Sequence, residues 1–184
     1  MAATSPETTL GVSAPDFALP ATDGRTVRLA DVAGENGTVV AFICNHCPYV
    51  VSAARRLVAD ARTLADEGVG FVAICSNDAV NYPADSFERM KEFAETWGFP
   101  FPYLHDESQE VARAYGAVCT PDFFGFDRDL SLRYRGRMDG GGTAQPPEGA
   151  PRELVEAMRS VARTGAGPEV QMPAVGCSIK WKAA

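Results

Sequence analysis

Apolar residues occur along this chain either in short continuous runs or at helical spacing. The runs Gly37–Cys44 and Val69–Cys75 are rich in β-branched residues, a pattern typical of strands that are buried on both faces. Between them, residues 48–65 carry apolar side chains at helical spacing, with arginines and aspartates on the outer side. The sequence therefore predicts a βαβ unit that contains two parallel strands.

Shorter elements are predicted on both sides of this unit. The dipeptide Asp23-Gly24 separates two short apolar segments and predicts an N-terminal β-hairpin. Further along, the pattern predicts helices over 85–97, 107–115 and 152–163, an extended piece over 101–104, and a closing hairpin formed by 123–126 and 130–135. This order of elements predicts an α/β protein with a mixed central sheet flanked by helices.

The remaining segments show no such periodicity. We expect residues 1–12 to form a flexible leader, residues 13–164 to form one domain, and residues 165–184 to form an irregular C-terminal tail.

Composition and charge narrow the class of protein. The chain has 184 residues, 46% of them hydrophobic and 22% charged, which is the composition of one ordinary globular domain. A net charge of −7 argues against nucleic-acid binding and against a polybasic membrane patch. No apolar stretch approaches the roughly 20 residues of a membrane span, and the first residues lack the basic and apolar regions of a secretory signal. We therefore expect a cytoplasmic protein with no nucleic-acid or membrane partner.

Five cysteines are present, and two of them lie in the segment Cys44–Pro48, between the first buried strand and the first long helix. The N-terminus of a helix stabilises a thiolate and lowers its pKa below the free value of about 8.5. Cys47 directly precedes the helix, and Pro48 suits the first helical turn. Two packed, inert thiols are the alternative, but a C-x-x-C at such a junction predicts redox chemistry.

Three segments then resemble the thioredoxin superfamily: Ala14–Pro20, Val39–Pro48 and Cys119–Asp127. More narrowly, they are similar to the branch of alkyl hydroperoxide reductases and thiol-specific antioxidants, the peroxiredoxin-like proteins, over residues 11–164. The resemblance implies a thioredoxin-like fold with an added N-terminal β-hairpin. It also implies a thiol oxidoreductase or peroxidase with antioxidant activity and no cofactor, acting as a monomer or homodimer. The implied partners are a dithiol reductant, such as thioredoxin or glutathione, and a peroxide or disulfide substrate.

The resemblance also implies roles for individual residues. The nucleophile of thioredoxins lies five residues after a strand phenylalanine, and counting from Phe42 leads to Cys47. Thr120 and Pro121 match the family's Thr-Pro pair, whose cis proline faces the active-site sulfur; a plain turn is the alternative. Arg133 matches the arginine that supports the thiolate in peroxiredoxins, with a solvated strand residue as an equal alternative.

Three positions depart from the family pattern. Val50 stands where thioredoxins have their second cysteine, and Cys44 stands where peroxiredoxins have a threonine or serine. Val40 replaces a proline of the same peroxiredoxin motif. The peroxide pocket is therefore not reproduced residue by residue, although thiol chemistry in general is retained.

An oxidised Cys47 needs a second thiol to resolve it. We rank Cys44 first because it is near in sequence, Cys119 second because it precedes the Thr-Pro pair, and Cys177 third because the tail could fold back over the site. Cys75 ends a buried strand and is expected to be an inert core thiol.

A different class of function uses the same residues as ligands. Cys44, His46, Cys47 and Cys119 offer donor atoms for Zn²⁺ or Cu(I) in a thioredoxin-fold protein without turnover. No second C-x-x-C completes a zinc pattern, so the redox reading is preferred. His46 could also act as acid or base beside Cys47, or be an exposed loop residue. His105 is expected to be structural or exposed.

Overall fold

The computed structural model describes residues 2–183 and contains both predicted kinds of element. The strands are β1 (Ala2–Thr4), β2 (Ala18–Pro20), β3 (Thr26–Arg28), β4 (Gly37–Phe42), β5 (Val69–Cys75), β6 (Tyr103–His105), β7 (Cys119–Thr120), β8 (Asp122–Phe126), β9 (Leu132–Gly136) and β10 (Val175–Ser178). The helices are α1 (Leu29–Val32), α2 (Pro48–Asp66), α3 (Phe87–Trp97), α4 (Glu110–Tyr115) and α5 (Glu153–Thr164), with a 3₁₀ turn η1 at Pro83–Asp85.

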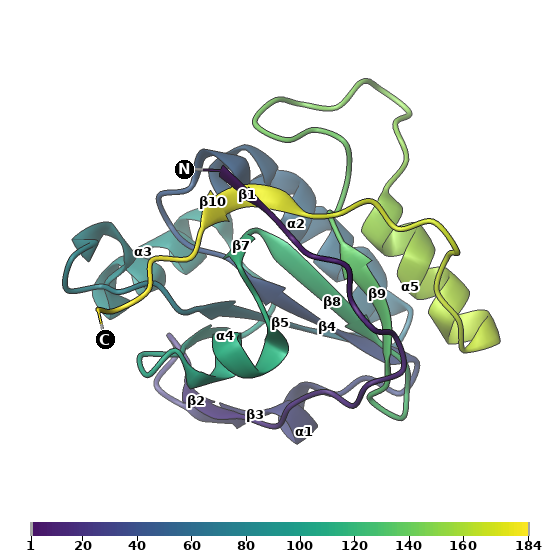
Figure 1. Cartoon of the computed structure of the whole chain (residues 1–184), viewed down its shortest axis with the longest axis horizontal. Helices are drawn as coiled ribbons and strands as arrows, with labels where there is room; N and C mark the ends of the chain where they lie inside the picture. Colours follow the sequence, from purple (N-terminus) through teal and green to yellow (C-terminus); the bar gives the residue numbers. More distant parts are fainter. Residues whose placement is uncertain (1, 184) are drawn as a thin grey trace.

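A five-stranded mixed sheet, in the order β6-β5-β4-β8-β9, forms the centre of the protein (Figure 1). Strands β4, β5 and β6 run parallel, whereas β8 is antiparallel to β4 and β9 is antiparallel to β8. Every residue of β4 is buried, which explains its continuous apolar run. The α/β prediction of a mixed sheet flanked by helices is confirmed.

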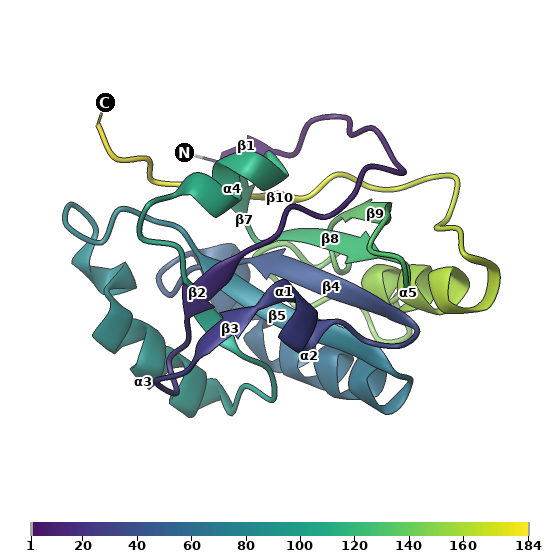
Figure 2. The ribbon, with the colours of Figure 1, turned by 90° about the horizontal axis from the view of Figure 1, so that it is seen from below.

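Two apolar layers cover the two faces of this sheet. One layer unites residues of α2, α3 and α5 with one set of strand side chains. The other unites the alternate strand residues with the β2–β3 hairpin, α1 and α4. Figure 2, seen from below, shows the hairpin and α1 in front of the sheet and α2 behind it. Within residues 2–183, none of the helices combines the length and the apolar character that crossing a bilayer requires.

The N-terminal hairpin forms where the sequence predicted it. Strands β2 and β3 pair antiparallel around the turn that contains Asp23 and Gly24. Gly24 has a φ of +89°, a conformation that favours glycine, so the Asp-Gly pair determines the turn. Val27 faces the sheet and is buried, whereas its two neighbours in β3 are exposed.

The two ends of the chain differ from their predicted states. Residues 2–4, expected in a flexible leader, form β1, and residues 175–178, expected in an irregular tail, form β10. Together with β7 they make a small antiparallel sheet in the order β1-β10-β7, seen near the N-terminal end of α2 in Figure 1. These strands are too short to show a periodic pattern, and each is defined by a partner far away in the sequence.

Glycine is required where β10 meets β7. A Cβ atom on Gly176 would lie 1.9 Å from the backbone oxygen of Thr120, so only glycine permits this approach. The register pairs Cys177 with Thr120 and Ser178 with Cys119. The fold thereby brings a residue near the end of the chain onto the Thr-Pro segment.

Candidate active site

Cys47 occupies the N-cap of α2, as its position before Pro48 predicted. Its backbone is extended, with φ −70° and ψ 123°, and Pro48 begins the first helical turn. The backbone N–H groups of a first helical turn lack partners within the helix, so they favour a negative charge at this point. Cys47 is fully buried. The thiol therefore lies at a helix N-terminus but is shielded from bulk solvent.

Thr120 and Pro121 lie opposite this sulfur. The peptide bond between them is cis. When it is protonated, the Cys47 thiol donates a hydrogen bond to the Thr120 carbonyl oxygen at 3.1 Å. The side-chain oxygen of Thr120 lies 3.2 Å from the sulfur of Cys44 and donates to the Cys177 carbonyl oxygen at 3.5 Å. Thr120 thus contacts three cysteines from two segments of the chain, the C-x-x-C segment and β10.

The thiols around Cys47 affect its ionisation. Interaction with the Cys44 thiol is the largest effect and lowers the pKa of Cys47, and the Cys177 thiol and the Val50 backbone N–H lower it further against the opposing effect of burial. The same interaction with Cys47, together with burial, raises the pKa of Cys44 far above its ordinary range. Cys47 is therefore the thiolate of the group, and Cys44 is the proton-bearing neighbour.

Cys177 belongs to β10 and is brought near Cys47 by its pairing with Thr120. Burial and the nearby Cys47 sulfur raise the pKa of Cys177. Unlike Cys44 and Cys47, it is only partly buried. All five cysteines are free thiols in this structure. The third-ranked candidate from the sequence is therefore one of the two thiols that interact with Cys47.

The Cys119 and Cys75 thiols do not share the hydrogen bonds around Cys47 in the part of the chain described. The Cys119 thiol donates weak hydrogen bonds to the backbone oxygens of Pro121 and Ala174, and burial raises its pKa to about 12. In the part of the chain described, no hydrogen bond joins Cys119 to Cys47, so its second rank as the resolving thiol is not supported. Consecutive strand residues point to opposite faces, and Thr120 takes the face that meets Cys47. Cys75 is fully buried, and burial raises its pKa to about 12.

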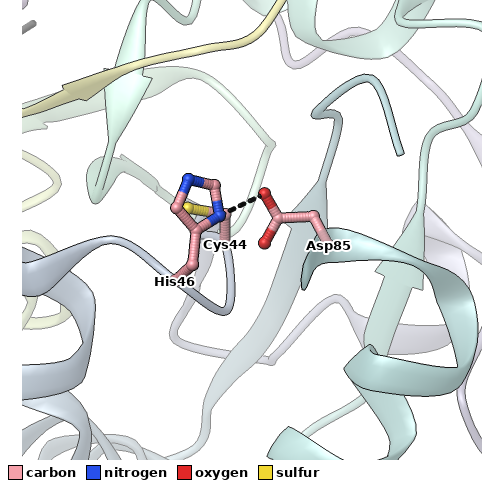
Figure 3. A group of neighbouring side chains, drawn as sticks. All are labelled: Cys44, His46 and Asp85. Carbon is pink, nitrogen blue, oxygen red and sulfur yellow. Dashed lines mark ion pairs between the residues drawn. The ribbon is translucent and has the colours of Figure 1, made fainter. Parts of the chain in front are cut away.

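A second polar group adjoins the C-x-x-C segment. Figure 3 shows His46 and Asp85 joined by an ion pair of 2.7 Å between Nδ1 and a carboxylate oxygen, with Cys44 beside them. Asp85 is fully buried, and it also accepts hydrogen bonds from the Asn45 backbone N–H at 2.8 Å and from Asn77 at 2.7 Å. His46 is thus an exposed residue of the loop before α2, one of the two alternatives that the sequence left open, and it has a buried carboxylate as its partner.

The chain matches the model of the AhpC/TSA family over residues 10–135, which is more than half of its length. The chain belongs to the AhpC/TSA family. It is therefore a thiol-dependent oxidoreductase with a thioredoxin-like fold. The match includes Cys44, Cys47 and Cys119 but ends before Cys177, so β10 is not part of the AhpC/TSA signature.

Other members and neighbours resemble the chain over most of its length. Rv2521 of Mycobacterium tuberculosis, provisionally named a peroxiredoxin, is 30% identical over 64% of this chain and 69% of its own. A structure of a conserved protein from Geobacillus kaustophilus has a TM-score of 0.91 at 49% identity and covers 100% of this chain and 98% of that one. The protein SMc02350 of Sinorhizobium meliloti has a TM-score of 0.90 at 41% identity, covering 98% and 99%.

Arg133, proposed from the resemblance to support the thiolate, does not lie beside Cys47. Its guanidinium pairs with Asp127 at 2.7 Å. On β9 it lies next to the end of β8 that pairs with the beginning of β4, whereas Cys44 and Cys47 follow the opposite end of β4. The assignment of Arg133 to this AhpC/TSA site is therefore wrong, since its ion pair belongs to the turn before β9.

Arg135, two residues further along, lies at the correct end of the sheet. It pairs with buried Asp122 at 2.9 Å, directly after Pro121, and its guanidinium stacks on Phe124. Sequence reasoning missed it, although Arg133 and Arg135 share one face of β9. Asp85 was also missed, because it is the first residue of the predicted helix 85–97, where an aspartate resembles an ordinary helix start, and nothing local linked it to His46.

Proposed function

We propose that this chain is a two-thiol peroxidase in which Cys47 is the nucleophile and Cys177 is the resolving thiol. The observation that carries the proposal is the position of Cys47 at a helix N-terminus, where the Cys44 and Cys177 thiols both lower its pKa. A nucleophile, a proton-bearing neighbour and a second thiol from β10 are thereby present in one place.

The first step is the attack of the Cys47 thiolate on the peroxide oxygen. The O–O bond breaks, the sulfur gains one oxygen as a sulfenic acid, and the peroxide leaves as an alcohol or water after taking up a proton. Hydrogen bonds to a thiolate stabilise its charged form, so the Cys44 thiol has the donor role that a hydroxyl has in peroxiredoxins. This role differs from the resolving role that the sequence suggested for Cys44.

The second step is the attack of Cys177 on the sulfenic sulfur, which forms a Cys47–Cys177 disulfide and releases water. Cys177 is favoured over Cys44 because the pKa of Cys44 is raised much further and Cys44 is fully buried. Part of the elevation of the Cys177 pKa comes from the negative charge of Cys47. That charge disappears when Cys47 becomes a neutral sulfenic acid, which makes the Cys177 thiolate easier to form.

Burial favours a small oxidant. Cys47 has no exposed surface, so a protein disulfide could reach it only if β10 moved. A cavity of about 150 Å³ lies beside the Thr-Pro segment and is lined in part by Tyr49, Pro121 and Val175. A cavity of this size supports hydrogen peroxide or a small alkyl hydroperoxide as the substrate.

The cycle closes when an external dithiol, such as thioredoxin, or glutathione reduces the Cys47–Cys177 disulfide. The dithiol is itself oxidised to a disulfide, so the net reaction transfers two electrons from the reductant to the peroxide. This reaction is antioxidant, and it requires a reducing compartment such as the cytoplasm.

The test treats the reduced full chain with one equivalent of hydrogen peroxide and identifies the products by mass spectrometry. The parent protein should give a Cys47–Cys177 disulfide. Cys177→Ser should stop at the sulfenic acid or proceed to the sulfinic acid, and Cys47→Ser should lose peroxide reduction altogether. Cys75→Ser is the matched control, because it removes a thiol that does not interact with Cys47.

Two results would contradict the proposal. Undiminished peroxide reduction by Cys47→Ser would remove the nucleophile from the mechanism. A Cys44–Cys47 disulfide that forms equally in the parent protein and in Cys177→Ser would return the resolving role to Cys44. A small disulfide tested in place of peroxide separates the two substrate classes, and faster reaction with the disulfide would assign a disulfide reductase.

A further inference from the structure

The geometry points to a binding site for a divalent transition metal, with Zn²⁺ as the natural occupant, formed by Cys44, His46 and Asp85. One sulfur, one imidazole nitrogen and one carboxylate oxygen lie within 4.8 Å of one another (Figure 3). This mixture of donors suits zinc, whereas Cu(I) prefers sulfur and imidazole without a carboxylate. The set differs from the ligands suggested by the sequence, since Asp85 replaces Cys47 and Cys119.

The charge of the cluster favours a cation. Asp85 is fully buried, and among residues 2–183 its ion pairs involve the His46 imidazole but no lysine or arginine. A buried carboxylate is costly unless a cation compensates it. A divalent ion bound by one thiolate, one carboxylate and one neutral imidazole would give a site with no net charge.

The surroundings of Asp85 hold its carboxylate in place. One oxygen accepts the Asn45 backbone N–H, and the other accepts the Asn77 amide. Such outer partners orient metal-binding groups in known sites. The Asn45 hydrogen bond also joins Asp85 directly to the C-x-x-C segment, so two distant parts of the chain are fixed relative to each other.

Metal binding requires a small movement of His46 and releases two protons. The His46 nitrogen and the Asp85 oxygen are 2.7 Å apart, whereas ligands on one tetrahedral zinc ion are separated by roughly 3.3 Å when metal–ligand bonds are about 2.0 Å long. His46 is partly exposed and can move by this amount. The His46 imidazolium of the ion pair loses its Nδ1 proton and keeps the one on Nε2, and the Cys44 thiol loses a second proton to solvent, when both bind the metal.

An ion can approach from a neighbouring cavity. A cavity of about 530 Å³ reaches the cluster at His46 and is lined in part by Asn45, His46, Pro83 and Ala84. Three protein ligands leave the fourth tetrahedral position to water, as in open zinc sites.

The test measures metal affinity in the reduced, metal-free full chain. Zn²⁺ is titrated in competition with a chromophoric chelator, and Co²⁺ is used as a spectroscopic probe. We expect one ion per chain, a thiolate-to-cobalt absorption band and tetrahedral cobalt bands. Asn77→Ala should weaken Zn²⁺ binding by about 10–100-fold, the usual effect of losing an outer partner. His46→Gln, Asp85→Asn and Cys44→Ser should weaken it further.

The controls separate this site from the peroxidase thiols. Cys47→Ser and Cys177→Ser should retain Zn²⁺ affinity, although Cys47→Ser loses peroxide reduction and Cys177→Ser loses disulfide formation. His105→Gln should bind Zn²⁺ as the parent does. Circular dichroism shows whether Asp85→Asn still folds, and His46→Gln provides a test that does not depend on a buried residue. The proposal fails if no stoichiometric binding occurs. It also fails if Cys47→Ser and Cys177→Ser lose the metal while His46→Gln retains it.

Discussion

Arg133 and Arg135 lie two residues apart on one strand, yet their side chains differ in exposure. Arg135 and its partner Asp122 are both buried, whereas the Arg133 side chain is 36% exposed although its partner Asp127 is buried. Removing one member of a buried pair leaves an uncompensated charge, but an exposed pair contributes little. The alternation of residues in the sequence places both arginines on one face of β9. It could not show which of them has a buried partner near the site.

This contrast predicts a large difference in stability. Arg135→Met should lower the free energy of unfolding by about 3–5 kcal/mol, because Asp122 remains buried without its partner. Arg133→Met should lower it by about 1 kcal/mol or less. Urea denaturation of both variants measures the difference, and equal losses would contradict this account of Arg135.

Cys44 offers a second prediction for a single residue. Cys44→Ala removes the neighbour that contributes most to the lowered pKa of Cys47, so that pKa should rise by about one unit or more. Cys44→Ser keeps a donor and should restore much of the effect. The ultraviolet absorbance of the thiolate, followed against pH, measures the shift. An unchanged Cys47 pKa in Cys44→Ala would assign the effect to the helix terminus and the Cys177 thiol.

The elements divide into those that local sequence determines and those that it does not. The run Val69–Cys75 became β5 with the same bounds, because a strand buried on both faces has a continuous apolar sequence. Helix α2 likewise follows its apolar spacing. By contrast, β1, β7 and β10 have two to four residues each, and their pairing depends on partners far along the chain.

The same division explains the site. Cys44 and Cys47 were predictable because one short motif contains both and because a helix begins directly after it. Cys177 ranked third because only the formation of β10 brings it to Thr120. Asp85 reaches His46 through a contact between segments that no periodicity links.

Whether β10 covers Cys47 can be tested by a substitution at Gly176, where β10 closely approaches the Thr120 backbone. Gly176→Val places side-chain atoms against the Thr120 backbone oxygen and should detach β10 from β7. Cys47 would then react at least roughly tenfold faster with a bulky maleimide, which corresponds to about 1.4 kcal/mol in the opening equilibrium. Val175→Ala, at an exposed neighbouring position, is the control. An unchanged rate in Gly176→Val would mean that β10 does not cover the thiol.

Two buried thiols, Cys75 and Cys119, make the stability of the whole molecule depend on pH in the same direction. Burial raises the pKa of Cys75 and Cys119 to about 12 in the folded state. In the unfolded chain these thiols ionise near pH 8.5. Between these values the unfolded state has lost protons that the folded state keeps, so the free energy of unfolding falls as pH rises.

The expected slope is about 1.4 kcal/mol per pH unit for each such thiol. Cys75→Ala should reduce the slope between pH 9 and pH 11 by about that amount. Chemical denaturation at several pH values measures both slopes. Identical slopes in the parent protein and in the variant would show that Cys75 ionises equally easily in both states.

The pairing of β1, β10 and β7 also determines when the site can be completed during synthesis. A ribosome makes the chain from its N-terminus, so β10 emerges after every segment that it contacts. The central sheet and α2 can form while residues 175–178 are still inside the ribosome. Until they are released, the nascent protein has a Cys44–Cys47 motif that β10 does not cover, and its thiols are open to oxidants and to thiol exchange. Because β10 follows β1 and β7 in the sequence, its pairing is the later event that brings Cys177 to Thr120.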